Sequence, residues 1–112
     1  MIDLLKYKDV IDFPKPYMME YPPGWEDIVI DLLDKILEKN LECQILQIKE
    51  KFGQLRVYYA SSHYDEIKEL VKNAELLCDS TCQISGDKGA LRNIGGWLIV
   101  LSDEEYEKRT TK

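Results

Sequence analysis

Residues 42–60, ECQILQIKEKFGQLRVYYA, have the most informative pattern in the chain. Apolar, β-branched and aromatic residues alternate with polar ones on both sides of a short turn, which predicts two strands over about 42–51 and 54–60. A turn this short joins antiparallel strands as a hairpin, and Gly53 can adopt the positive φ angle that such a turn needs. Alternation along the second strand places Leu55, Val57 and Tyr59 on one face and Arg56 and Tyr58 on the other.

A helix is predicted on each side of this hairpin. Apolar residues recur at steps of three and four over about 25–39, which indicates an amphipathic helix that ends near Asn40. A second apolar stripe predicts a helix that runs to about residue 79, with Ser61 and Ser62 as its N-terminal cap. The stripes consist of Trp25, Ile28, Val29, Leu32, Leu33, Ile36 and Leu37, and of Ile67, Leu70, Val71, Ala74, Leu77 and Cys78.

The two ends of the chain have weaker patterns. Prolines interrupt residues 1–24, which predicts an irregular arm whose apolar side chains lie over the core. Residues 85–96 are rich in turn formers, and the apolar run at 97–101 predicts a short buried strand. The following acidic residues predict a terminal helical turn or two, capped by Ser102.

The order helix, hairpin, helix, strand predicts a small two-layer α+β fold. The length of 112 residues favours one domain, residues 1–112, because a chain of this size buries enough surface for a single core. Within it, residues 25–79 form the helix–hairpin–helix part and residues 80–112 a C-terminal segment. Trp25 and Trp97 are both expected to be buried, because large aromatic side chains contribute most to a small core.

Composition and charge exclude several functional classes. Apolar residues make up 45% of the chain and charged residues 32%, which is typical of a globular protein. The net charge of −6 argues against general binding to nucleic acid or to an anionic membrane, because both need clustered Lys and Arg. The sequence has neither an apolar run long enough for a membrane span nor a signal-peptide pattern at its start. We therefore expect a cytoplasmic protein.

The residues that most often carry catalysis or hold metals are sparse. Three cysteines and one histidine, without a paired C-x-x-C motif, are too few for a typical structural zinc site. Cys43 and Cys78 fall on apolar faces and are interpreted as buried core residues, whereas His63 at a polar helix start is expected to be solvated. No catalytic triad, phosphate-binding loop or dinucleotide motif is present. We therefore expect neither an enzyme nor a cofactor.

The hairpin tip is the one locally positive part of this acidic chain. Residues 41–60 carry three basic and two acidic residues, whereas residues 1–40 carry five basic and nine acidic ones. The pattern has two interpretations: a docking site for a carboxylate, a phosphate or an acidic partner surface, or a solvated hairpin whose lysines protect its edge from aggregation. Arg56 has a further structural alternative, an ion pair with an acidic residue of a neighbouring helix. The candidate binding residues are Lys49, Lys51, Arg56 and Tyr58.

Three segments together resemble a family of small phage and prophage proteins of unassigned function. They are GWEDIVIDLLDKIL, QIKEKFGQLRVYY and CDSTCQISGDKGALRNIGGWLIVLSDEE, and the resemblance covers about residues 24–105. The family pattern has a K-E-K-F-G-G-L-R-F-Y hairpin and a C-terminal zinc knuckle. The resemblance implies a phage or mobile-element origin but no known activity.

This chain departs from the family pattern at the knuckle. Cys82 is kept, but Ser85, Ser102 and Glu105 stand at the other three presumptive ligand positions. One thiolate cannot hold a zinc ion, so the resemblance implies a degenerate, metal-free knuckle-like segment. Its trace would be held instead by apolar packing of Ile84, Leu91, Ile94, Trp97 and Ile99.

Two functional hypotheses follow. The first is a non-catalytic binding module of phage or prophage origin that docks on a host or phage protein and acts as a modulator or inhibitor of host defence. In a variant of this hypothesis, the acidic helix faces engage a basic partner. The alternative is a protein that binds or sequesters a small anionic, nucleotide-like ligand through the hairpin residues. The sequence neither requires nor excludes a homo-oligomer.

Overall fold

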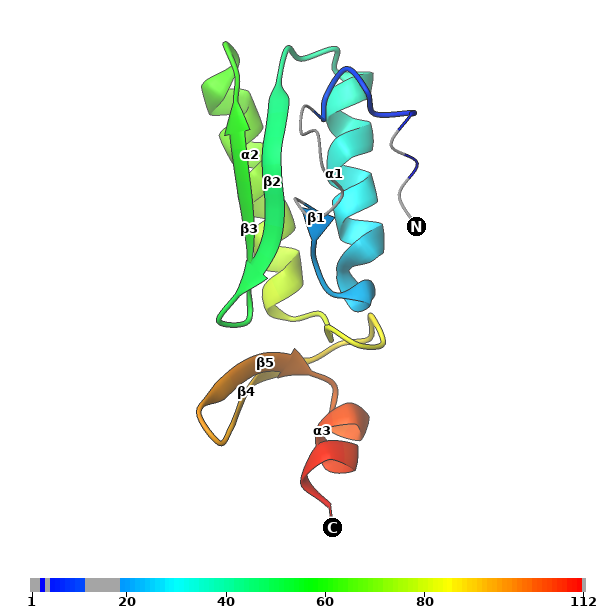
Figure 1. Cartoon of the computed structure of the whole chain (residues 1–112), viewed down its shortest axis with the longest axis vertical. Coiled ribbons are helices and arrows are strands. Elements are labelled where there is room, and N and C mark those ends of the chain that lie inside the picture. Colours follow the sequence, from blue (N-terminus) through cyan, green and yellow to red (C-terminus); the bar gives the residue numbers. More distant parts are fainter. Residues whose placement is uncertain (1–2, 4, 12–18, 112) are drawn as a thin grey trace.

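The computed structural model describes residues 3, 5–11 and 19–111, and their elements form a small α+β fold (Figure 1). The predicted helices and hairpin are all present, with bounds within about two residues of those predicted. The elements are β1 (Met19–Glu20), the 3-10 turn η2 (Pro23–Trp25), α1 (Glu26–Glu38), β2 (Gln44–Lys51), β3 (Gln54–Ala60), α2 (Tyr64–Asp79), β4 (Ala90–Ile94), β5 (Trp97–Leu101) and α3 (Asp103–Thr110).

The central sheet has the strand order β1-β2-β3. The short strand β1 runs parallel to β2, and β2 runs antiparallel to β3 with a bulge between Ile45 and Gln47. The β2–β3 turn has positive φ angles at Phe52 (56°) and Gly53 (78°), and the Glu50 carboxylate accepts a hydrogen bond from the Gly53 N–H at 2.7 Å. Two consecutive positive φ angles match the twist of the strands, as the sequence predicted for Gly53.

The main core lies between this sheet and helices α1 and α2. Its centre is formed by buried apolar side chains of the two predicted helical stripes, by Leu55 of the predicted core face of the second strand, and by Ile45 and Ile48 of the first strand. Leu77 is an exception, because it is 52% exposed at the rim of the groove between the helices. The central side chains are Trp25, Val29, Leu33, Ile36, Ile45, Ile48, Leu55, Ile67 and Cys78.

The described part of the N-terminal arm covers this core. Tyr7 and Val10 are buried, and the Tyr7 hydroxyl donates a hydrogen bond to the Asp34 carboxylate of α1 at 2.6 Å. Met19 and Tyr21 are partly buried against the same cluster. The prolines at positions 14 and 16 and their neighbours Tyr17 and Met18 lie outside the described residues.

The start of α2 differs from the prediction. Ser61 and Ser62 do not cap the helix, which begins at Tyr64 after His63 without a side-chain cap. Both serines instead bind Glu42 in the segment before β2: the Ser61 hydroxyl donates to its carbonyl, and the Ser62 hydroxyl donates to its carboxylate at 2.6 Å. Instead of a local helix cap, the two serines thus form hydrogen bonds that join the end of β3 to the segment before β2.

The C-terminal segment contains a second hairpin, which was not predicted. β4 lies inside the stretch interpreted as turns, and it pairs with β5. Helix α3 follows, and the Ser102 hydroxyl accepts a hydrogen bond from the Glu105 N–H at 3.2 Å, which confirms the predicted cap. Cys82, Ile99 and Leu101 form a small separate cluster with Ile94 and Tyr106 at its edge. Figure 1 shows this segment at the end of the molecule nearest the β2–β3 turn.

The prediction that Trp97 is buried is wrong, because its side chain is 58% exposed. Trp97 is the first residue of β5, directly after Gly95 and Gly96, and neither glycine has any neighbour within 4 Å of a Cβ position. The β4–β5 turn therefore extends beyond the cluster. Leu91 and Ile84, which were also expected to pack this segment, are exposed as well.

Candidate functional site

The four candidate residues lie together on one face of the β2–β3 hairpin. The register pairs Lys49 with Arg56, Lys51 with Gln54, and Gln47 with Tyr58. Because side chains alternate between the two faces of a strand, these residues point away from the core face, on which Ile48 and Leu55 are buried. We call the surface formed by Lys49, Lys51, Arg56 and Tyr58 the hairpin face.

The hairpin face has unbalanced positive charge. Lys49 and Arg56 are directly opposite each other, and like charges in this arrangement destabilise a sheet. Glu20 of β1 is the neighbour of Lys49 on its other side. Among the described residues, however, neither lysine nor Arg56 forms an ion pair.

An aromatic ring lies close to each lysine of the hairpin face. The Lys49 ammonium lies 5.4 Å from the centre of the Tyr58 ring, and the Lys51 ammonium lies 5.4 Å from that of Phe52. Tyr58 is 46% exposed and Phe52 is 63% exposed. Sequence reasoning did not select Phe52, although its place in the turn predicts exposure. A partner on this face would therefore meet both positive charge and exposed aromatic surface.

Arg56 is the most constrained residue of the hairpin face. One terminal guanidinium nitrogen donates to the Gln54 side-chain oxygen at 3.0 Å, while the buried Nε has no hydrogen-bond partner among the residues that the structure describes. Burial raises the pKa of Glu75 on α2, and the nearby charge of Arg56 opposes this shift. The structural alternative for Arg56 is thus present as proximity to Glu75, but without an ion pair between them.

The hairpin turn is held against the C-terminal hairpin. A Cβ at Gly53 would lie 2.6 Å from the Leu91 Cδ1 atom and 3.6 Å from the Leu98 carbonyl oxygen. The sequence alone does not indicate this approach, because the two segments are nearly forty residues apart. The contact fixes the position of the basic turn relative to the C-terminal segment.

The four knuckle positions also come together. Cys82 is fully buried, and its sulfur accepts a hydrogen bond from the Ser85 N–H at 3.5 Å. The backbone of Ser102 also donates to this sulfur, and Ser102 in turn caps α3 next to Glu105. In the described part of the chain, no group of three or more His, Cys, Asp or Glu side chains is arranged to hold a metal ion. Hydrogen bonds thus connect the positions at which the family pattern has zinc ligands.

The three thiols differ in acidity. Burial raises the pKa of Cys43 to about 11 and that of Cys78 to about 12, which fits their interpretation as core residues. Burial also acts to raise the pKa of Cys82, but donors from Ser85, Ser102 and Ile84 outweigh it and lower that pKa to about 7. His63 is exposed at the start of α2, with its Nδ1 3.6 Å from a Glu66 carboxylate oxygen.

We predict that only one of these three thiols ionises near pH 7 in the folded protein. Because the pKa of Cys82 is below its ordinary value of 9.0, the folded state releases this proton first, and the free energy of unfolding rises between about pH 7 and 9. Thiolate absorbance measured against pH should show one early step, absent in Cys82→Ser and retained in Cys78→Ser. A first ionisation above pH 9 would contradict the role of the Ser85 and Ser102 donors.

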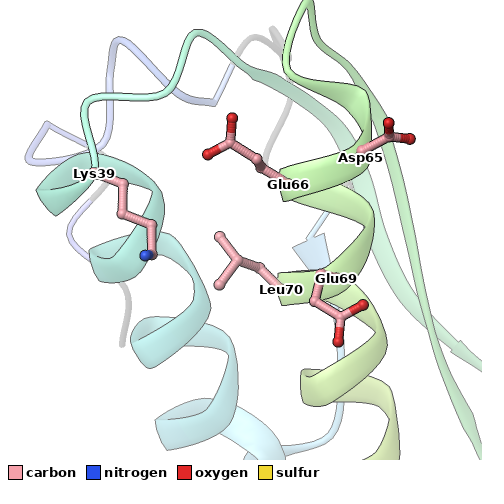
Figure 2. A pocket seen from close by; sticks show the side chains of 5 residues that line it. All are labelled: Lys39, Asp65, Glu66, Glu69 and Leu70. Carbon is pink, nitrogen blue, oxygen red and sulfur yellow. The ribbon is translucent and has the colours of Figure 1, made fainter.

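A shallow depression of about 370 Å³ lies far from the hairpin face, between the end of α1 and the start of α2. Figure 2 shows Glu66 and Leu70 pointing from α2 towards Lys39 of α1, with Asp65 and Glu69 at the outer side. Three carboxylates and one ammonium group make this depression acidic. It suits cationic groups, whereas the hairpin face suits anionic ones.

Comparisons with known proteins identify no relative: no protein-family model, curated protein or solved structure matches the chain.

Proposed function

We propose that this protein is a non-catalytic binding module that docks through the hairpin face on an acidic surface of a partner protein. The observation that carries the proposal is the opposed pair of Lys49 and Arg56, joined by Lys51, without an ion pair to any described residue. Cations left in this arrangement favour an anionic partner, because that partner relieves their mutual repulsion. The net charge of −6 over the whole chain keeps the protein from binding polyanions in general.

The shape of the hairpin face favours a protein over the alternative, a small nucleotide-like anion. Small ligands are usually held in concave sites that bury most of their surface. Lys49, Lys51, Arg56 and Tyr58 belong to two neighbouring strands, and none of them lines the depressions of about 370 Å³ and 440 Å³ around α1 and α2. A broad acidic surface can contact Lys49, Lys51 and Arg56 at the same time. A small molecule without a pocket around it cannot.

We also propose a biological setting, the interior of a host cell. The resemblance of the hairpin and knuckle segments to phage and prophage proteins supports a phage or mobile-element origin only. In that setting the partner would be a host defence protein in the host cytoplasm, which this module would modulate or inhibit. Within the described residues, no helix is long and apolar enough to cross a membrane.

We predict that Arg56→Glu strongly weakens docking while the fold is maintained. The new carboxylate would lie opposite Lys49, which is favourable, and its charge would reach Glu75 on the other face of the sheet, which is unfavourable. Because each effect is worth under about 1 kcal/mol, the free energy of unfolding should change by less than about 1 kcal/mol. Binding should fall at least about tenfold, because an attractive contact becomes repulsive. The measurement is capture of partners from host cytosol on the immobilised wild-type and variant proteins, combined with thermal melting of both.

Lys72→Glu is the matched control, since it makes the same charge change at an exposed position of α2. A partner that is lost with Arg56→Glu and retained with Lys72→Glu would support docking at the hairpin face. Equal loss of the partner with both variants would show that docking depends on net charge and not on the hairpin face. A large drop in melting temperature of Arg56→Glu would show that Arg56 is chiefly the structural neighbour of Glu75.

A further inference from the structure

Strand β3 has one unpaired edge. It is the outer strand of the order β1-β2-β3, with its seven residues free of proline (Figure 1). Among the described residues, no backbone hydrogen bond outside the β2–β3 ladder involves Gln54–Ala60. Such an edge is a template for one more strand, and addition of a strand from a partner is a recurrent mode of peptide recognition.

The register determines which backbone groups are free. Lys51 and Gln54 pair across a two-residue turn, so they form the hydrogen-bonded pair that closes the hairpin. In an antiparallel ladder, alternate residues direct both backbone groups to the same side. The N–H and C=O groups of Leu55, Val57 and Tyr59 therefore point to the open side of β3.

The two sides of this edge differ in chemistry. On the hairpin face, Arg56 and Tyr58 of β3 lie next to the lysines of β2. On the opposite face, the half-buried side chains of Val57 and Tyr59 border the edge. Burial raises the pKa of the Tyr59 hydroxyl, and the neighbouring Tyr64 and Cys43 add to this shift. Glu75 of α2, on the same side, makes the smallest contribution.

We propose that the partner contributes an extended segment in which acidic and apolar residues alternate, and that this segment pairs with β3. Its acidic side chains would lie beside Arg56 and the lysines, and its apolar side chains would cover Val57 and Tyr59. This inference rests on the proposed function and specifies its partner. A uniformly acidic segment is disfavoured, because half of its carboxylates would face Glu75 and the apolar side.

A second copy of the chain is a weaker candidate for the same edge. Pairing of β3 with β3 of another copy would bring the two α2 helices close together, because α2 packs against β3 in each copy. This helix carries five acidic residues and two lysines, so the two helices would repel each other. Charge thus favours an acidic strand from a different protein over self-association.

The test uses defined peptides with the full-length protein. The probe is a peptide of about eight residues, long enough to span the seven residues of β3, in which Glu alternates with Val and Thr. Its controls are a peptide of the same composition in block order and an alternating peptide with N-methyl groups on every second residue, which block one edge without a change in charge. Affinity is measured by titration, and the site is located from amide chemical shifts.

We expect the alternating peptide to bind at least about tenfold more tightly than both controls and to shift the amides of Leu55, Val57 and Tyr59. Equal binding of the alternating and block peptides, both lost in Arg56→Glu, would overturn strand pairing and leave the proposed docking intact. Absence of peptide binding would overturn strand pairing, while the partner capture with Arg56→Glu and Lys72→Glu decides the docking separately. Peptide binding that is unchanged in Arg56→Glu would overturn both. Dimers in sedimentation without peptide, with β3 amides protected from exchange, would show that a second copy occupies the edge.

Discussion

Replacement of Trp25 by alanine is expected to lower the free energy of unfolding by about 3–5 kcal/mol, the usual cost of removing a large buried aromatic side chain. Trp25 is 0% exposed and packs in the main core between the start of α1 and the sheet. Its indole Nε1 also donates a hydrogen bond to the Thr81 carbonyl oxygen at 2.8 Å. The substitution therefore leaves a cavity and also breaks a link to the C-terminal segment.

The measurement is equilibrium unfolding in denaturant, with Trp97→Ala as the matched control. Because the Trp97 side chain is 58% exposed, its removal should cost under about 1 kcal/mol. Comparable losses in the two variants would contradict the placement of Trp97 at the exposed end of β5. A Trp25→Ala protein that unfolds like the parent would show that the core does not depend on this side chain.

Gly24→Ala is expected to destabilise the protein by about 3 kcal/mol, although it adds a single methyl group, because overpacking against fixed backbone forces the chain to shift. A Cβ at Gly24 would lie 2.0 Å from the Cys82 carbonyl oxygen and 2.7 Å from the Gln83 carbonyl carbon. The Gly24 N–H also donates to the Gln83 carbonyl oxygen at 2.8 Å. The turn before α1 and the start of the C-terminal segment would have to separate.

Gly95→Ala is the control for this substitution. Gly95 has a positive φ angle of 61°, but nothing lies within 4 Å of its Cβ position, so alanine should cost only the backbone strain of about 1 kcal/mol. Thermal melting compares the two variants, and amide exchange shows whether residues 81–110 loosen first in Gly24→Ala. A smaller loss for Gly24→Ala than for Gly95→Ala would be inconsistent with the close backbone approach at Gly24.

The part of the candidate site that depends on the alternation of side chains along a strand was predictable from the sequence. The period of two around a short turn indicates that Arg56 and Tyr58 lie opposite the core face, and local charge marks the turn as basic. Three features of the site depend on other parts of the chain: Glu20 beside Lys49, Glu75 near Arg56, and the free edge of β3. These features depend on residues that are distant in sequence, so a local sequence pattern cannot predict them.

The sequence was enough to predict the helices, the first hairpin and its turn, because hydrophobic period and turn chemistry act over a few neighbouring residues. It did not determine that Ser61 and Ser62 bind Glu42, that residues 90–94 form β4, or that Trp97 is exposed while Trp25 is buried. Both tryptophans are equally apolar, and only the packing of distant segments decides which one is enclosed. Burial and strand pairing depend on which surfaces meet in the folded chain, and a local period does not encode this. Glu42 lies 20 residues before Ser62, and Trp25 contacts Thr81 of the C-terminal segment, whereas Trp97 begins β5 at an exposed turn.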